Sequence, residues 1–193
     1  KERIDGILGV EDLAMETVAY IAWEMGLPGN DPDGVNRIIH KNKFRELLRS
    51  LGLMCPEYTA SSTFPEFQEK VRKMKYPLVI KPAQCSSSRG VFKMESFDAE
   101  ELKFRFDDAA SFSSDGIVCA EQFIPSPTNT ILEFSVFVKD GGIVWNHALS
   151  DTHCKYNPLV PSQCSLPGVM TERQKAVAFD AIEKVFHATG TRF

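Results

Sequence analysis

The stretch from Tyr76 to Lys93 places the tightest constraint on how this chain folds. It begins with the run Tyr-Pro-Leu-Val-Ile-Lys-Pro, in which apolar and β-branched residues lie between two prolines. Such a run predicts a short strand, because proline can begin or end a strand but cannot donate a hydrogen bond within its ladder. Strand character resumes at Val91, after small hydroxyl residues and Gly90. Since glycine is free to take a positive φ, we expect a hairpin with Lys81 at the end of its first strand.

A hairpin of this kind can turn several backbone N–H groups and one ammonium toward an anion, which is a chemistry suited to phosphate. Neither G-x-x-x-x-G-K-[ST] nor G-x-G-x-x-G occurs in the sequence, so neither a P-loop nor a Rossmann dinucleotide fingerprint supports phosphate binding here. For this stretch taken alone, a polar hairpin tip with a solvated lysine is the alternative.

Composition narrows the function classes. A chain of 193 residues with 43% hydrophobic content can bury a sizeable core in one large domain or two small lobes. The formal net charge is −4 with both signs interspersed, so the basic footprint of a nucleic-acid-binding protein is missing. No apolar stretch approaches the roughly 20 residues that cross a bilayer, and we expect no membrane partner. Five widely spaced cysteines without a C-x-x-C pair predict free thiols in a reducing, cytoplasmic compartment.

Two further residue patterns bear on the site. Four residues near one another in sequence, His147, His153, Cys154 and Cys164, match no regular zinc-ligand spacing, which disfavours a zinc site. Lys43 falls in the first turn of an expected helix, where the helix dipole disfavours a cation. A phosphate held near this helix N-terminus would explain the lysine, and an ordinary surface position is the alternative.

Apolar periodicity predicts alternating helices and strands. Residues 4–10 are expected to form a buried strand, followed by a helix from residue 11 to about residue 25, which together make a β–α unit. Residues 27–34 are dense in turn residues and mark a connector. We expect further helices over 42–51, 64–74, 98–110 and from 171 onward, and strands over 56–59, 117–124, 132–138 and 143–149.

Local signals define several of the boundaries. Asp140-Gly141 predicts a tight hairpin turn. The patterns Thr63-x-x-Glu66 and Thr171-x-x-Gln174 predict capping boxes at two helix starts. The proline-containing segment over residues 150–168 is expected to be an irregular surface loop that touches a ligand.

Five short motifs, in this order and with these intervals, resemble the ATP-grasp superfamily over essentially the whole chain. They are Asn42-Lys43, the Pro-Leu-Val-Ile-Lys-Pro strand, Ser88-Arg89-Gly90-Val91, Glu121-Gln122-Phe123-Ile124, and Glu133-Phe134-Ser135-Val136 before the Asp-Gly turn. The ending of the small-residue loop is most similar to the carboxylate–amine ligase branch, which contains the L-amino-acid ligases and carnosine-synthase-like enzymes.

The resemblance implies a nucleotide site. Lys43 and Lys81 would be the catalytic ammonium groups that grip the α- and β-phosphates of ATP. The loop that contains Ser86, Ser87, Ser88 and Gly90 would fold over the phosphates as a mobile flap and donate backbone N–H groups. Relatives usually carry glycines where Ser86 and Ser87 stand.

The base and sugar contacts are implied in the same way. Glu121 would meet the adenine amino group, while the backbone of Gln122 and Ile124 would bond the adenine edge. Glu133 would accept hydrogen bonds from the ribose hydroxyls. An exposed strand carboxylate is the alternative for Glu121, and the polar phase of an alternating strand is the alternative for Glu133.

The implied fold is α+β, with two lobes gripping ATP and a partial N-terminal β–α unit. Residues 1–40 would be the end of a preceding α/β domain with its linker, and residues 41–193 an ATP-grasp domain. Within that domain, the lid would span about 64–121, and the larger lobe would begin over about 132–193. The Mg²⁺ ligands of the family, an acidic residue and a Glu-x-Asn pair, lie beyond the final helix. We therefore expect a chain truncated before the metal-binding strands and inactive alone.

The implied reaction joins a small-molecule carboxylate to an amine through an acyl phosphate, with ATP and Mg²⁺ as cofactors and a possible homodimer as the assembly. Two alternatives remain open. One is a non-catalytic ATP-grasp module for nucleotide binding or interaction. The other is an enzyme of the biotin-carboxylase or carbamoyl-phosphate type, in which bicarbonate is the carboxylate.

Overall fold

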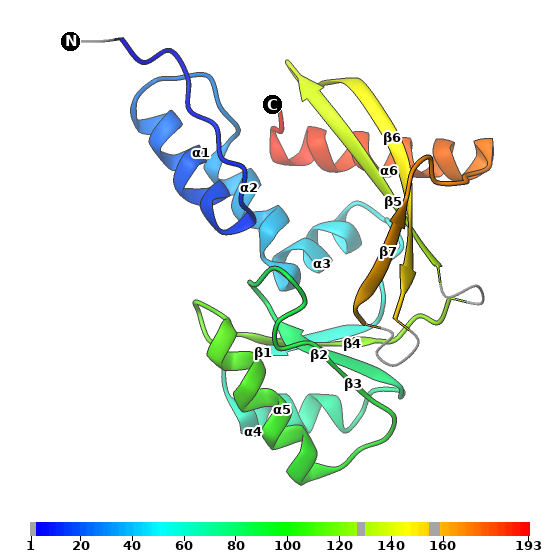
Figure 1. Ribbon diagram of the computed structural model, residues 1–193. Coiled ribbons are helices and arrows are strands. Elements are labelled where there is room, and N and C mark those ends of the chain that lie inside the picture. Colours follow the sequence, from blue (N-terminus) through cyan, green and yellow to red (C-terminus); the bar gives the residue numbers. More distant parts are fainter. Residues whose placement is uncertain (1–2, 127–129, 155–158) are drawn as a thin grey trace. The chain divides into compact units, whose positions relative to one another are not determined.

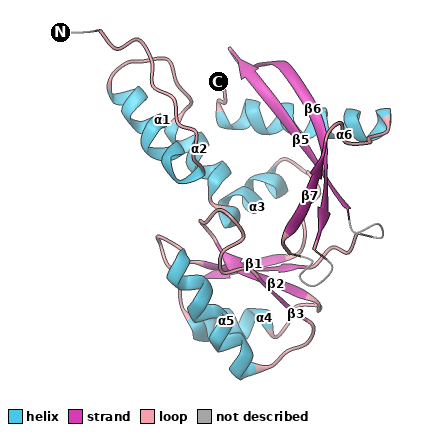
Figure 2. Ribbon diagram, in the orientation of Figure 1, coloured by secondary structure: helices cyan, strands magenta, loops and turns pink. Residues whose placement is uncertain are grey.

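The computed structural model describes residues 3–126, 130–154 and 159–193 of the chain (Figure 1). The chain forms two compact units, each of which is described by itself. Unit 1 comprises Lys1–Ile39, Thr128–His153 and Pro161–Phe193, and unit 2 comprises His40–Pro127 and Cys154–Val160. Both units combine helices with an antiparallel sheet, as the colouring in Figure 2 shows, so the predicted α+β class is confirmed. The predicted division at residues 40 and 41 stays a prediction.

Unit 2 is built on a four-stranded antiparallel sheet in the order β1-β4-β2-β3. Its strands are β1 (Tyr58–Ser61), β2 (Leu78–Pro82), β3 (Phe92–Met94) and β4 (Val118–Gln122). The proline-bounded run of the sequence is thus a central strand, with Pro82 as its last residue. Its burial alternates, so Leu78, Ile80 and Pro82 lie on the buried face while Val79 and Lys81 lie on the other.

Two helices, α4 (Phe64–Val71) and α5 (Ala99–Phe112), cover the buried face of this sheet (Figure 1). Asp98 caps α5 by accepting a hydrogen bond from the backbone N–H of Glu101. The core between helices and sheet is fully apolar and includes Phe67, Val71, Leu78, Ile80, Leu102, Phe106, Val118 and Ala120. Burying each large side chain contributes about 1.5–3 kcal/mol, so this core makes the sheet a firm support for the residues on its opposite face.

A third helix of unit 2, α3 (Lys41–Ser50), is attached to the end of β2. The backbone N–H of Lys41 donates to the carbonyl oxygen of Ala83 at 2.9 Å, one residue beyond that strand. This bond uses one of the N–H groups that a helix start leaves without a partner inside the helix. The first turn of α3 is therefore placed beside the Lys81 end of the strand.

Within the described residues, unit 1 pairs a three-stranded antiparallel sheet with four helices. The sheet has the order β5-β6-β7, with β5 (Thr130–Lys139), β6 (Gly142–His153) and β7 (Pro161–Ser165). The helices are η1 (Asp12–Ala14), α1 (Met15–Glu24), α2 (Pro32–Ile39) and α6 (Glu172–Thr189).

Several local predictions for unit 1 are confirmed. The β5–β6 turn is at Asp140 and Gly141, which both have positive φ, as the Asp-Gly pattern predicts. Thr171 and Gln174 form the predicted capping box at the start of α6. That helix packs on the sheet through an edge-to-face contact between Phe134 and Phe179, whose ring centroids are 5.0 Å apart.

Several local predictions are wrong. Residues 4–10 form no strand, and Leu8 and Val10 are 86% and 87% exposed; within the described residues no neighbouring strand pairs with this run. Residues 150–168 are not wholly irregular, because β6 continues to His153 and β7 adds a polar edge strand. Helix α2 begins inside the segment predicted as a connector, since proline is well suited to a first helical turn.

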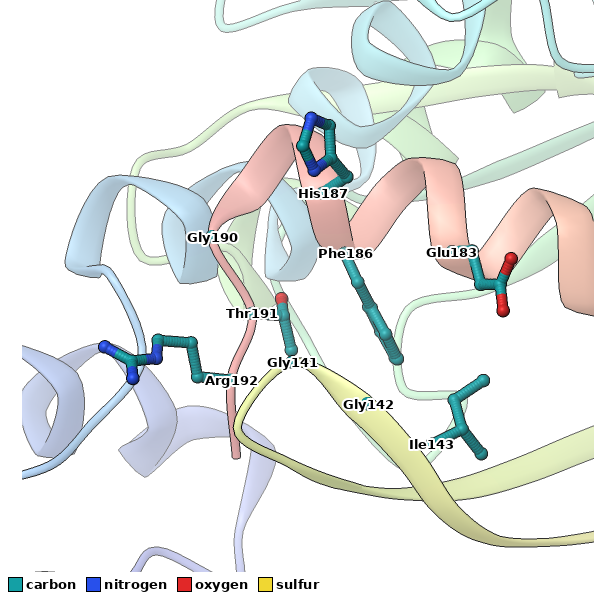
Figure 3. A pocket seen from close by; sticks show the side chains of 9 residues that line it. All are labelled: Gly141, Gly142, Ile143, Glu183, Phe186, His187, Gly190, Thr191 and Arg192. Atoms are coloured by element: carbon teal, nitrogen blue, oxygen red, sulfur yellow. The ribbon is translucent and has the colours of Figure 1, made fainter.

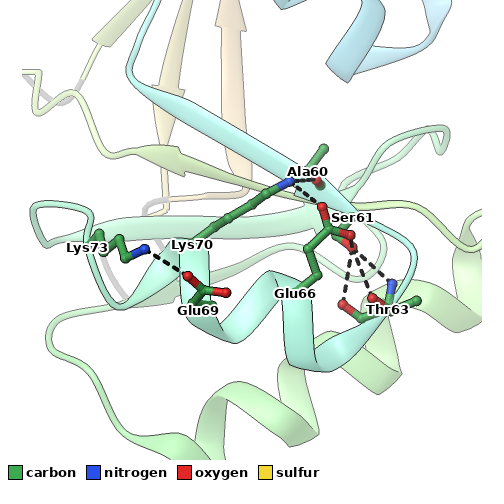
Figure 4. A network of polar contacts seen from close by, with 7 residues as sticks. All are labelled: Ala60, Ser61, Thr63, Glu66, Glu69, Lys70 and Lys73. Atoms are coloured by element: carbon green, nitrogen blue, oxygen red, sulfur yellow. Dashed lines mark hydrogen bonds and ion pairs between the residues drawn. The ribbon is translucent and has the colours of Figure 1, made fainter.

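The predicted capping box at Thr63 does not form, although α4 does begin at Phe64. The Glu66 carboxylate instead accepts from the Ser61 hydroxyl at 2.7 Å and pairs with Lys70 at 2.6 Å (Figure 4). Ser61 Oγ also accepts from the backbone N–H of Thr63 at 3.1 Å. A serine from the preceding strand thus binds the Thr63 N–H and the Glu66 carboxylate, two groups that the capping box would have joined to each other.

Gly90 supplies a test of how tightly the β2–β3 hairpin packs on helix α5. It has a φ of +64°, and a Cβ atom there would lie 2.8 Å from the Phe112 ring and 3.2 Å from the Ala109 backbone. Gly116 has a φ of +68° but open space around it. Alanine at either position costs about 1–2 kcal/mol for the left-handed backbone. We expect Gly90→Ala to cost about 1–3 kcal/mol more, through overpacking. Urea unfolding measures both variants, and equal losses would contradict the close packing.

Candidate functional site

Lys81 and Glu121 form an ion pair on the face of the unit 2 sheet opposite its apolar core. In the β2–β4 register, Lys81 is opposite Cys119 and Val79 is opposite Glu121, so the lysine and the glutamate are diagonal neighbours on one face. Lys81 Nζ lies 2.6 Å from Glu121 Oε2, and the two side chains are only 15% and 7% exposed. The strand pairing therefore joins two residues that are 40 positions apart in sequence.

Arg45 of helix α3 closes over the same carboxylate. Its Nε donates to Glu121 Oε1 at 3.0 Å, and its Nη2 donates to Oε2 at 3.1 Å. Two parallel N–H donors on two carboxylate oxygens make the bidentate geometry that only arginine can offer, and it holds the plane of the carboxylate. Glu121 thus accepts from two cations that come from different elements of unit 2.

Lys41 supplies a third cation one helical turn before Arg45. Its Nζ donates to the carbonyl oxygen of Cys85 at 2.9 Å. Burial, and secondarily the nearby Lys81 ammonium, lower the pKa of Lys41 below its usual value. An anion placed here would favour the charged form of Lys41, because it would offset the repulsion from Lys81.

The electrostatic balance of these groups keeps Glu121 ionised. Burial by itself would raise the pKa of the Glu121 carboxyl, but Lys81 and the hydrogen bond from Arg45 outweigh burial and hold the pKa below its usual value. The pKa of the neighbouring Cys119 thiol is shifted in the opposite direction, since burial and Glu121 raise it to about 12. Cys119 is therefore a protonated, structural thiol at neutral pH and not a nucleophile.

We call Lys41, Arg45, Lys81 and Glu121 the basic cluster. Two of its cations, Arg45 and Lys81, contact the carboxylate, and the third, Lys41, binds the Cys85 carbonyl oxygen within the electrostatic influence of Lys81, so the cluster has an excess of two positive charges in a largely buried place. The chain as a whole carries a net charge of −4, so this concentration of positive charge is local. Such a site suits a ligand with several negative charges, because water screens the attraction between opposite charges less in a buried place.

The loop after β2 adjoins the basic cluster through Cys85, whose carbonyl oxygen binds Lys41. Ser87, Ser88 and Gly90 have φ values of 61°, 53° and 64°, so the chain turns sharply here. The serines at 87 and 88 are exposed, while Gly90 is buried against Phe112 and Pro82. Left-handed residues in a tight loop can bring backbone N–H groups together as an anion-binding concavity, which fits the predicted role of this loop.

The end of β4 carries the two residues predicted to meet the adenine edge. The N–H of Gln122 already donates to the carbonyl oxygen of Glu57 at 2.9 Å, and the N–H of Phe123 donates to Pro77. A contact between a base and the Gln122 backbone would therefore use its carbonyl oxygen. Ile124 follows the strand and is 69% exposed.

Two predicted site residues, Glu133 and Lys43, are not part of the basic cluster. Glu133 is on β5 of unit 1, where it is exposed and accepts a hydrogen bond from the Ser135 hydroxyl at 3.4 Å. Lys43 is on α3, but residues two positions apart do not share a helix face, so it does not lie with Lys41 and Arg45. Sequence analysis missed Lys41 and Arg45 as site residues, although their four-residue spacing is the signal that places two cations on one helix face.

Unit 1 holds a cavity of about 430 Å³ between the β5–β6 turn and the end of α6 (Figure 3). It is lined by Gly141, Gly142, Ile143, Glu183, Phe186, His187, Gly190, Thr191 and Arg192. None of the site residues selected from the sequence lines this cavity. In the part of the chain that the structure describes, no group of three or more His, Cys, Asp or Glu residues is placed to hold a metal ion. Over residues 3–126, 130–154 and 159–193, no helix has the length and apolar character of a membrane span.

Comparison with known proteins gives a consistent family. The model of the D-ala D-ala ligase C-terminus family matches residues 47–192. The uncharacterized protein y4rH of Sinorhizobium fredii is 28% identical over 194 residues, which cover 97% of this chain and 38% of that protein. The carbamoyl phosphate synthase large chain of Vibrio vulnificus is 25% identical over 173 residues, which cover 86% of this chain and 15% of that protein.

Among solved structures, the L-amino acid ligase from Bacillus licheniformis superimposes with a TM-score of 0.69 at 22% identity. The match covers 96% of this chain and 42% of that protein. The predicted ATP-grasp fold is thereby confirmed. The chain spans less than half the length of each of these relatives.

The depressed pKa of Glu121 makes a prediction about acid stability. We expect Glu121→Gln to lose about 3–5 kcal/mol of stability at neutral pH, because it leaves two largely buried cations without their carboxylate. The folded pKa is below the ordinary value of 4.5, so the wild-type advantage is complete above pH 4.5 and shrinks as the pH falls through the folded pKa. Urea unfolding across this range measures the difference, with the exposed Glu57→Gln as control. An advantage that stays constant into acid would contradict the ion-pair assignment.

Proposed function

Because the chain belongs to the D-ala D-ala ligase C-terminus family, we propose that it forms the nucleotide-binding part of an ATP-dependent ligase that joins a carboxylate to an amine. The observation that carries the proposal is the basic cluster, in which Arg45 and Lys81 contact Glu121 on the outer face of the unit 2 sheet and Lys41 adds a third cation at the loop after β2. The two excess positive charges match a polyphosphate, and the ionised carboxylate matches a hydrogen-bond donor on the same ligand.

The residues of unit 2 fit ATP in kind and in charge. Lys41 and Lys81 would hold the α- and β-phosphates, and the loop over Ser86–Gly90 would add backbone N–H donors. Glu121 would accept a hydrogen bond from the adenine amino group, with the Gln122 carbonyl oxygen and the Ile124 backbone at the base edge. A contact between Glu133 and the ribose hydroxyls stays a prediction.

Lys41 takes the place that sequence analysis gave to Lys43. Its support is its hydrogen bond to Cys85 at the start of the phosphate loop, together with the electrostatic effect of Lys81 on its pKa. Lys43 lies on the same helix but on another face. A contact between Lys43 and the nucleotide stays a prediction, and separate variants of the two lysines decide between them.

The proposed reaction needs little covalent chemistry from the protein. The substrate carboxylate would attack the γ-phosphate of ATP and release ADP, and the amine would then displace phosphate from the acyl phosphate to leave an amide. Lys41 and Lys81 would align the phosphates and offset the charge that develops during transfer. Mg²⁺, when bound with ATP, would supply further charge neutralisation.

The setting of the protein is proposed on the same basis. All five cysteines are free thiols, which supports a reducing compartment, and we propose the cytoplasm. The partners would be ATP, a small-molecule carboxylate and an amine. A homodimer stays a prediction.

A carbamoyl-phosphate type of reaction is the second candidate, and the match to the large chain of carbamoyl phosphate synthase favours it. In that reaction bicarbonate takes the place of the organic carboxylate. Release of ADP from the full-length protein separates the two: stimulation by bicarbonate alone indicates the carbamoyl-phosphate type, whereas a requirement for an amino acid indicates the ligase. ATP binding without any turnover would indicate a non-catalytic module.

Isothermal titration of the chain with ATP and Mg²⁺ tests the site. We expect ATP binding in the micromolar to millimolar range, and a loss of at least about tenfold, or 1.4 kcal/mol, in Lys81→Ala and in Lys41→Ala. Each variant removes one of the ammonium groups that the phosphates would contact.

Lys73→Ala is the matched control, because Lys73 is an exposed lysine that pairs with Glu69 on α4. It should bind ATP like the wild type. Loss of ATP binding in Lys43→Ala, with binding retained in Lys41→Ala, would reverse the assignment of the two lysines. Equal ATP affinity in the wild type and Lys81→Ala would refute the proposed site.

A further inference from the structure

Arg45 is the one cation of the basic cluster to which the proposed nucleotide chemistry gives no task. It points both of its parallel donors at Glu121, at 3.0 and 3.1 Å, so its charge is directed to the carboxylate. We propose that Arg45 is a positioning residue that makes Glu121 select a base with an exocyclic amino group, adenine, over a base with a keto group at that place, guanine. This inference rests on the proposed function.

Counting acceptor sites shows what Arg45 leaves open on Glu121. An ionised carboxylate has about four lone-pair sites on its two oxygens. Oε2 accepts from both Lys81 Nζ and Arg45 Nη2, so its two sites are filled. Oε1 accepts from Arg45 Nε and keeps one site. With the plane of the carboxylate fixed by the arginine fork, that remaining site has a set direction.

The remaining site can accept a hydrogen bond but cannot donate one. Arg45 and Lys81 keep the carboxylate ionised, because both cations stabilise its charged form. The amino group of adenine can donate a hydrogen bond to Oε1. The keto oxygen of guanine would face a negatively charged acceptor with no proton between them, which leaves both groups without a partner. Selection of this kind is strong when the polar groups of the site are buried, and Glu121 is 5% exposed.

Lysine could not replace Arg45 in this role. Lys81 shows the difference within the same cluster, since its ammonium contacts a single oxygen of Glu121 and leaves the carboxylate free to turn about its bond. Arg45 lies one helical turn after Lys41, so the helix that would supply a phosphate lysine also supplies the group that orients the base acceptor. Helix α3 would thereby set the phosphate and base contacts together.

The experiment compares three probes: ATP, GTP and inorganic tripolyphosphate, each titrated with Mg²⁺ into the chain. Tripolyphosphate reports on the phosphate lysines alone. The variants are Arg45→Lys, which keeps the charge and removes the fork, and Arg49→Lys as matched control. Arg49 is one turn further along α3, where its guanidinium stacks on the Tyr58 ring at 4.1 Å. A second test variant, Glu121→Gln, replaces the acceptor-only carboxylate with an amide that can also donate.

In the wild type we expect ATP to bind at least about tenfold more tightly than GTP. Arg45→Lys should reduce this ratio about tenfold, mainly by weakening ATP, while its affinity for tripolyphosphate stays within about twofold. Glu121→Gln should shift the ratio toward GTP, because its amide N–H can meet the keto oxygen. Arg49→Lys should keep the wild-type ratio.

A wild-type ratio of ATP to GTP affinity in folded Arg45→Lys would overturn this inference and leave the proposed nucleotide site standing. Absence of ATP binding by the folded wild type would overturn the proposed function, and the inference with it. If Arg45→Lys does not fold by circular dichroism, Arg45→Gln takes its place, because its amide can donate to Glu121 through a single arm but cannot form the fork, and the same reduction of the ATP to GTP ratio is expected.

Discussion

The charge network around Glu121 is the constraint on which the outer face of the unit 2 sheet depends. A carboxylate with only 5% exposure is tolerable because Arg45 and Lys81 donate to it, and those cations are tolerable in turn because the carboxylate neutralises one of them. Removing one partner of such a buried pair typically costs about 3–5 kcal/mol, since the others are left uncompensated. Each member therefore restricts the conformation of the rest.

The apolar side of the same sheet makes this network possible. Helices α4 and α5 bury one face of β2 and β4, and side chains on a strand alternate between faces. The residues that are not needed for the core, Lys81 and Glu121 among them, are thereby directed together to the other face. Helix α3 reaches that face from the end of β2, through the Lys41 backbone and the Arg45 side chain. A concentration of positive charge thus arises in a chain whose net charge is negative.

Several features followed from local sequence because their causes are local. The proline-bounded strand at residues 78–82, the Asp140-Gly141 turn and the Thr171 capping box each depend on residues within a few positions of one another. The failures have a different origin. The apolar run at residues 4–10 has no strand to pair with among the described residues, and Ser61 displaces Thr63 as the partner of Glu66. In both cases the outcome depended on a partner outside the motif, which is missing among the described residues for the first and is Ser61 for the second.

The sequence by itself determined the family, the α+β class, and the choice of Lys81 and Glu121 as candidate site residues. It did so because strand ends, turns and capping residues are read over short spans, and because the order of five motifs is preserved along the chain. Only the tertiary structure decided that Lys41 is attached just beyond the Lys81 strand, and that Arg45 binds Glu121 across 76 residues of sequence. Strand register and the docking of α3 bring these groups together, and neither is set by the residues adjacent to them in the chain.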